Sequence, residues 1–320
     1  MMNRRSLILA LALMPAAAVG QNRRFRIGWL VFGGASLGPI DQSLIDALSE
    51  RGFTDGRNLE ILFRYAKGSP AALAGLAAEL VAQKPDILIG IGGDVVGALF
   101  KASDGRIPVV GGVSDNPTQT GLAMTLAHPG KNFTGMAFLT DDLAAKRMEL
   151  LKEAAPNSRR VAVIWNPQHL DDEFVASRRG AEELGLVFSS HEINSSDAIN
   201  NVLRDIATAN ADSLFVIPSR LTGIAWPAIA NYAFEMRLPV VTAWREYVDN
   251  GCLLSYGPSR KLEARRLADG AVKVLGGASP ADIPIELPIR FELVINVKTA
   301  RAIGLTIPPT LLARADDVIE

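Results

Sequence analysis

Short runs of aliphatic and β-branched residues alternate along this chain with longer segments whose apolar residues recur at helical spacing. The run at 107–113 has a proline at its second position, then β-branched residues and glycines without polar alternation, which is typical of a parallel strand covered on both faces. Strands are also predicted at 25–32, 59–65 and 86–91. A helix between the first two carries apolar residues at i, i+4, i+5 and i+8, namely Ile40, Leu44, Ile45 and Leu48. This alternation of strands and helices predicts an α/β fold.

The same order of segments occurs twice along the chain. The matching pairs are 26–31 with 160–165, 86–91 with 212–217, and 107–110 with 238–241. Doubly wound units resemble one another, so any one pair could match by chance. Three pairs in the same order predict two similar lobes, each a doubly wound parallel sheet.

The lobes are expected to be joined by three crossover strands, near 138–140, 256–259 and 285–289. The first lobe is then predicted to hold residues 21–138 and 259–284, and the second lobe residues 139–258 and 285–320.

The first twenty residues have the composition of a secretory signal peptide. Arg4 and Arg5 precede an apolar run at 6–14, and small residues lead to an expected cleavage between Gly20 and Gln21. The run is too short to span a membrane. The arginine pair also resembles a twin-arginine signal, although the residues around it favour the general secretory route. We therefore expect a periplasmic protein.

Composition narrows the possible partners. The chain is 48% hydrophobic with a net charge of -1 and no basic block, which argues against nucleic acid or an anionic membrane surface as a partner. The single Cys252 excludes an intramolecular disulfide, and three histidines are too scattered for a metal cluster. We expect a monomer without a cofactor.

Two glycine-rich segments resemble catalytic or cofactor motifs. Residues 34–38 match the G-x-S-x-G pattern of a nucleophile elbow, which leaves a secreted α/β hydrolase that uses Ser36 as an alternative. The histidines are poorly placed for it, so a ligand-binding loop with Ser36 as a helix N-cap is favoured. Residues 90–97 resemble a dinucleotide loop, but Val95 replaces the third glycine and excludes that interpretation.

Several longer motifs resemble a known family. They are Gly-Phe-Thr-Asp-Gly-Arg-Asn-Leu at 52–59, Val-Ser-Asp-Asn-Pro at 113–117, His-Pro-Gly-Lys-Asn-Phe-Thr-Gly at 128–135, Phe-Glu-Leu-Val-Ile-Asn at 291–296 and Pro-Pro-Thr-Leu-Leu at 308–312. Together they resemble substrate-binding proteins of ABC transporters, of the tryptophan-type family with the type I periplasmic-binding fold. The chain departs from that family where Asn116 separates Asp115 from Pro117. The resemblance implies capture of a small, often amino-acid-like solute for a membrane permease. A sensor of the same fold remains an alternative.

An amino acid between two such lobes needs donors for its carboxylate and an acceptor for its ammonium. Amide groups at helix N-termini and small hydroxyls supply the donors, and Asp115 is the acid nearest to the carboxyl edge of the first sheet. Asp94 is also expected to cap the third helix. The candidate ligand-binding residues are Gly34, Ser36, Gly93, Asp94, Ser114, Asp115, Asn116, Asn166, Ser219, Trp244 and Tyr256. An Asx-type turn that only redirects the chain is the alternative for residues 114–117.

The signal peptide yields a first prediction. Protein recovered from the periplasm should begin at or near Gln21, because signal peptidase cleaves after small residues. N-terminal sequencing measures this directly, and a retained Met1 would contradict it.

Overall fold

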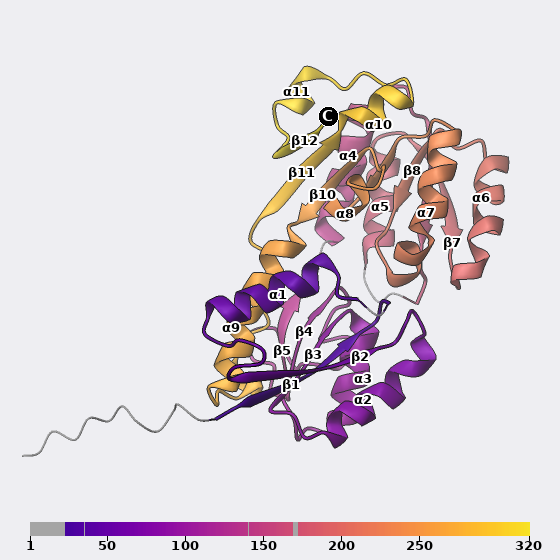
Figure 1. Cartoon of the computed structure of the whole chain (residues 1–320). Helices are drawn as coiled ribbons and strands as arrows, with labels where there is room; N and C mark the ends of the chain where they lie inside the picture. Colours follow the sequence, from indigo (N-terminus) through magenta and orange to yellow (C-terminus); the bar gives the residue numbers. More distant parts are fainter. Residues whose placement is uncertain (1–22, 35, 140, 169–171) are drawn as a thin grey trace, which may run out of the picture.

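The computed structural model describes residues 23–320 except 35, 140 and 169–171. The predicted signal peptide therefore lies outside the described residues. The chain forms two α/β lobes, each with its own sheet and helices on both faces (Figure 1). This arrangement confirms the predicted fold class.

The first lobe contains a parallel five-stranded sheet in the order β2-β1-β3-β4-β5. Its strands are β1 (Phe25–Val31), β2 (Leu59–Tyr65), β3 (Ile87–Ile91), β4 (Val109–Val113) and β5 (Phe133–Ala137). Its helices are α1 (Pro39–Glu50), α2 (Leu73–Ala82), α3 (Gly93–Ser103) and α9 (Arg260–Leu275). Trp29 faces α1 and α9, whereas the next residue, Leu30, faces α2 and α3. This alternation explains why the strands are apolar on both faces.

The second lobe contains a seven-stranded sheet in the order β12-β11-β10-β9-β8-β6-β7. Its strands are β6 (Arg160–Trp165), β7 (Val187–Glu192), β8 (Ser213–Val216), β9 (Val240–Thr242), β10 (Leu254–Pro258), β11 (Phe291–Asn296) and β12 (Asp317–Ile319). Strands β10 and β11 pair antiparallel, so the prediction of an entirely parallel sheet is wrong here. The chain leaves the lobe along β10 and returns beside it along β11, and an outgoing and a returning strand must run in opposite directions.

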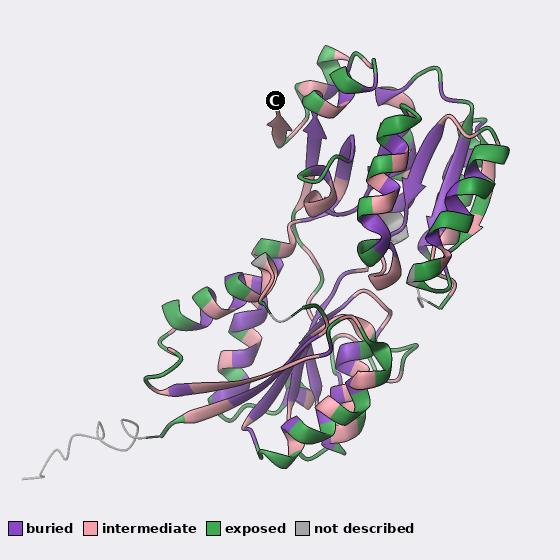
Figure 2. Cartoon of the chain, turned by 45° about the vertical axis from the view of Figure 1, so that its right-hand side comes forward, coloured by how far each residue is buried: buried purple, intermediate pink, exposed green. Residues whose placement is uncertain are grey.

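The helices of the second lobe cover both faces of this sheet. They are α4 (Asp141–Ala154), α5 (Glu173–Glu183), α6 (Ile199–Thr208), α7 (Arg220–Glu235), α8 (Arg245–Val248), α10 (Val297–Ala302) and α11 (Pro309–Leu312). Figure 2 shows buried strands and helices that are buried on their sheet side and exposed outside. No helix in the described part of the chain combines the length and apolar character that a membrane crossing requires.

The chain passes between the two sheets after β5, between β10 and α9, and before β11. The third passage begins slightly later than predicted. The amide of Ile285 donates to the carbonyl of Leu126 at 2.8 Å, and that of Glu286 donates to the carbonyl of Gly135 at 2.8 Å. Glu286 thus pairs with the edge of β5, which offers it free backbone partners, whereas Ile285 bonds to the loop that precedes β5.

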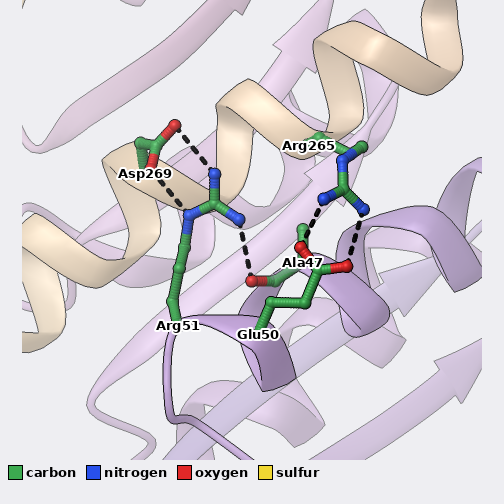
Figure 3. A network of polar contacts seen from close by, with 5 residues as sticks. All are labelled: Ala47, Glu50, Arg51, Arg265 and Asp269. Atoms are coloured by element: carbon green, nitrogen blue, oxygen red, sulfur yellow. Dashed lines mark hydrogen bonds and ion pairs between the residues drawn. The ribbon is translucent and has the colours of Figure 1, made fainter.

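Helix α9 belongs to the first lobe although it follows the second lobe in sequence, and it packs beside α1 (Figures 1 and 3). Arg51 pairs with Asp269 at 2.6 Å, and Arg265 pairs with Glu50. These pairs are solvent-exposed, so each contributes little to stability. Burial of Leu44 against the α9 side of the core stabilises the contact more, because a fully buried leucine contributes about 1.5–3 kcal/mol.

A buried ion pair joins three elements of the second lobe. Arg147 of α4 is 0% exposed, pairs with Glu173 of α5 and donates from Nε to the carbonyl of Tyr256 in β10 at 2.7 Å. Removing one partner would leave the other charge without its main counterion in the interior.

We therefore expect Arg147→Ala to lower the free energy of unfolding by about 3–5 kcal/mol, measured by urea denaturation at pH 7. Arg314→Ala is the matched control. It removes an exposed arginine of the same lobe that pairs with Glu153 at 2.7 Å, and should cost about 1 kcal/mol or less. Equal losses in the two variants would contradict the inference that the buried pair of Arg147 and Glu173 stabilises the lobe more than an exposed pair does.

Candidate functional site

A cavity of about 510 Å³ lies between the lobes. It is bordered by residues that follow β1, β3 and β4 of the first sheet and β6, β8 and β9 of the second. The carboxyl ends of parallel strands are where α/β proteins bind ligands. The volume is in the range of small-molecule sites.

The structure brings most of the sequence-predicted residues to this cavity. They are Gly93, Asp94, Ser114, Asp115, Asn166, Ser219 and Trp244. Gly34, Ser36, Asn116 and Tyr256 do not line it. Their role in binding is therefore not supported by the geometry.

Gly34 and Ser36 lie exposed in the loop after β1. Ser36 does not cap α1, contrary to the prediction. Gly38 is the N-cap residue, and its amide donates to the carboxylate of Asp41 at 3.0 Å. A proline at the first helical position and an acid in the first turn start this helix without a serine.

Asn116 and Tyr256 have structural partners instead. The side-chain oxygen of Asn116 accepts a hydrogen bond from the amide of Thr118 at 3.0 Å, which is an Asx turn. The alternative considered for residues 114–117 therefore holds at Asn116. Tyr256 lies in β10, where its ring packs near Phe291 at a centroid distance of 6.4 Å.

Two acidic residues lie at the cavity beside the N-terminus of α3, one in the helix and one in the segment after β4. Asp94 was predicted to cap this helix, but the N-cap residue is Gly92, and Asp94 lies in the first turn. The carboxylate of Asp94 accepts a hydrogen bond from the amide of Val95 at 3.1 Å. A Cβ atom on Gly93 would collide with the carboxylate of Asp115. The glycine therefore lets Asp115 approach the helix N-terminus, where the helix dipole favours an anion.

Two predicted polar residues of the second lobe have local hydrogen bonds. Ser219 is the N-cap of α7, and its hydroxyl accepts from the amide of Thr222 at 3.2 Å. The side-chain oxygen of Asn166 accepts from the amide of Gln168 at 3.0 Å. Both residues border the cavity while they stabilise the turns that hold it.

Aromatic residues form much of the apolar lining. Trp244 is 8% exposed and meets Phe138 edge to face, with ring centroids 5.8 Å apart. Tyr247 also borders the cavity, and burial raises the pKa of its hydroxyl to about 12, so it stays protonated. Phe32 completes the aromatic set. A flat apolar group would find aromatic contacts from both lobes here.

Two arginines were missed by the sequence analysis. Arg260 lies over the ring of Trp244 at 5.0 Å and is 3.8 Å from a carboxylate oxygen of Glu246. Arg220 is the first residue of α7 and forms an ion pair with Asp94 of the other lobe. The sequence did offer one signal for Arg220, because it directly follows Ser219, a residue predicted to lie at a strand end. Nothing in the sequence, however, shows which way its side chain points.

Among the described residues, no histidine is paired with Ser36. Of the histidines in the described residues, His191 lies in β7 with a ring nitrogen 3.0 Å from the hydroxyl of Ser189, and His128 lies in a loop. His169 lies outside the described residues. Among the described residues there is also no group of three or more His, Cys, Asp or Glu side chains that could hold a metal ion.

Two α/β lobes, three connecting segments and a cavity between them define the class of proteins that bind a small solute by closing two lobes around it. Comparison with known proteins agrees. The profile of the family described as ABC transporter substrate binding protein matches residues 30–319. The chain therefore belongs to this family, whose members are binding proteins and not enzymes.

Individual relatives resemble the chain over most of its length. A "Tyrosine-binding protein" of Clostridioides difficile is 25% identical over 84% of this chain and 78% of its own length. An ABC domain of Streptococcus pneumoniae solved in complex with L-Trp is 26% identical, covers 92% of this chain and 100% of its own, and has a TM-score of 0.83. A ligand-free, open substrate-binding protein with adhesive properties from Clostridium difficile is 25% identical over 92% and 99% of the two chains, with a TM-score of 0.67.

The close approach of Asp115 to Gly93 yields a prediction that compares two glycines of α3. Gly93→Ala should lower the free energy of unfolding by about 1–3 kcal/mol, because its Cβ forces the Asp115 carboxylate away from the α3 N-terminus. Gly97→Ala is the matched control. A Cβ there meets nothing within 4 Å, so it should stabilise the helix by about 0.5–1 kcal/mol. Thermal melting of the unliganded variants measures both, and a Gly93→Ala protein as stable as Gly97→Ala would contradict the proximity.

Proposed function

We propose that this chain is the exported, periplasmic solute-binding component of an ABC importer, acting as a monomer. It captures an amino-acid-like solute in the interlobe cavity and delivers it to a membrane permease. Family membership supports the link to a transporter. The apolar N-terminal run with small residues near Gly20 supports export.

The observation that carries the choice of solute is the mixed chemistry of the cavity. Acidic residues (Asp94 and Asp115), basic residues (Arg220 and Arg260) and aromatic rings border one volume of about 510 Å³. A zwitterion with a flat side chain matches all three features. The relatives agree, since one is named for tyrosine and another was solved with L-Trp.

In the proposed mechanism the solute binds where both lobes contact it. Such a ligand interacts with both lobes only when the cleft is closed, so it shifts an open ensemble towards the closed arrangement. This chain superposes better on the L-Trp complex than on the ligand-free, open relative, with TM-scores of 0.83 and 0.67. The comparison supports a closing motion between these two arrangements.

Within the site, Asp115 is proposed to accept the ammonium group of the solute. Ser114 precedes it at the end of β4, and Trp244 provides an apolar surface from the other lobe. Desolvated ammonium groups need a charged acceptor, because an ion taken from water without a partner costs several kcal/mol.

A thermal-shift experiment tests this proposal with L-tyrosine and L-tryptophan. At a hundredfold excess over the dissociation constant, a ligand that binds only the folded state stabilises it by about 2.7 kcal/mol, which moves the midpoint by several degrees. We expect at least one of the two amino acids to do so. Asp115→Asn should abolish the shift while changing the unliganded midpoint little, because the amide keeps the shape but not the charge.

Asn116→Ala is the matched control for that variant. It removes the acceptor of the Asx turn, so the unliganded midpoint should fall while the ligand-induced shift remains. An Asp115→Asn protein that keeps the full shift would refute the role of Asp115. Absence of a shift with either amino acid in the unmodified protein would count against an aromatic amino acid as the solute.

A further inference from the structure

The ion pair between Asp94 and Arg220 connects the two lobes across the cavity. Arg220 begins α7 of the second lobe, and Asp94 lies in the first turn of α3 in the first lobe. The guanidinium also lies over the ring of Phe32 at 3.7 Å, and a Cβ on Gly92 would collide with it. The first lobe therefore provides a binding site for this arginine of the second lobe, formed by Phe32, Gly92 and Asp94.

The two partners of this ion pair are unequally buried. The side chain of Arg220 is 19% exposed, whereas that of Asp94 is 45% exposed. Desolvation lowers the pKa of Arg220 to about 10, so its guanidinium keeps its charge at neutral pH and needs an anion. Asp94 can return to water at smaller cost. The cation is thus held in place, and its anion can be exchanged.

The other places for a ligand carboxylate in this cavity are less suitable. The N-terminus of α3 already has the carboxylates of Asp94 and Asp115 close to it, so a further anion there would meet like charges. Arg260 lies over Trp244 and near Glu246, which partly balances its charge. Arg220 is the more buried of the two arginines, 19% exposed against 27% for Arg260, so a carboxylate that pairs with it is better shielded from water.

We propose that Arg220 determines specificity for carboxylate-bearing solutes, and that the solute's carboxylate replaces Asp94 as the partner of its guanidinium. Without solute, the Asp94–Arg220 pair stabilises the closed members of the open ensemble. Asp94, the more exposed partner of the pair, turns to water when the solute's carboxylate takes its place. The solute class rests on the proposed function, whereas the ligand-free contact does not.

The first experiment compares L-tyrosine with tyramine, which lacks only the carboxylate. In the unmodified protein tyramine should bind at least about thirtyfold more weakly, because it leaves Arg220 with Asp94 and forgoes the charge-assisted hydrogen bonds that the carboxylate makes with the guanidinium. In Arg220→Gln this preference should fall to within a few-fold, and in Arg220→Lys it should be intermediate, because lysine keeps the charge but not the planar fork. Arg314→Gln, which removes an exposed arginine of the same lobe, should keep the full preference. A preference that persists in Arg220→Gln would overturn the inference.

The second experiment tests the exchange itself with 3-(4-hydroxyphenyl)propanoate, a carboxylate without an ammonium group. Asp94→Asn removes the competing anion, so calorimetry should find this compound bound several-fold more tightly than by the unmodified protein. Weaker or unchanged binding would show that Asp94 does not compete for Arg220, and would overturn the exchange.

A ligand-free measurement separates this inference from the proposed function. Small-angle X-ray scattering should give a larger radius of gyration for Arg220→Gln than for the unmodified protein and Arg314→Gln, because the interlobe pair is lost. Equal radii would overturn the ligand-free contact. If neither L-tyrosine nor L-tryptophan binds the unmodified protein, the proposed function fails for these solutes, and the scattering result still decides whether the pair holds the lobes together.

Discussion

The structure depends on the burial of two sheets, each between layers of helices. Trp29 and Leu30 are adjacent in β1 and both are almost fully buried, on opposite faces of the first sheet. Strands buried on both faces admit few polar side chains along their length, and those present, such as Thr134 and Thr242, are small. Polar residues therefore collect beyond the strand ends, and because the two sheets face each other there, Asp115 and Ser219 of different lobes border one cavity.

The return of the chain to the first lobe also constrains the structure. Helix α9 packs on the first sheet, and its Arg266 pairs with Glu263 at 2.6 Å and with Glu286 at 2.5 Å, and donates to the carbonyl of Leu287 at 3.1 Å. Burial raises the pKa of Glu263, and the nearby Arg266 opposes that rise. Arg266 thus connects the start of the third crossing to α9, the helix that follows the second crossing. The third connecting segment is therefore fixed at the first lobe as far as Leu287.

Charge in the cavity is balanced in pairs that cross between elements. Asp94 meets Arg220 from the other lobe, Arg260 lies near Glu246, and Asp115 lies at the N-terminus of α3. Each pairing reduces the cost of removing charged groups from water. An apolar cavity of the same volume would not select for charge.

The sequence by itself determined the two-lobe α/β fold and most of the strand-end residues of the cavity, because strand burial and helix periodicity are local patterns. Ser114 and Asp115 were found in this way. The resemblance to the family came from longer motifs such as those at 52–59 and 291–296. Whether a strand-end residue faces the cavity was decided by tertiary structure, since Asn116 turns back to Thr118 and Ser36 lies exposed outside. The antiparallel β10–β11 pair and the place of Arg220 over Phe32 also required the folded chain. Both depend on contacts between segments far apart in sequence, and no local pattern of residues encodes which distant segments meet.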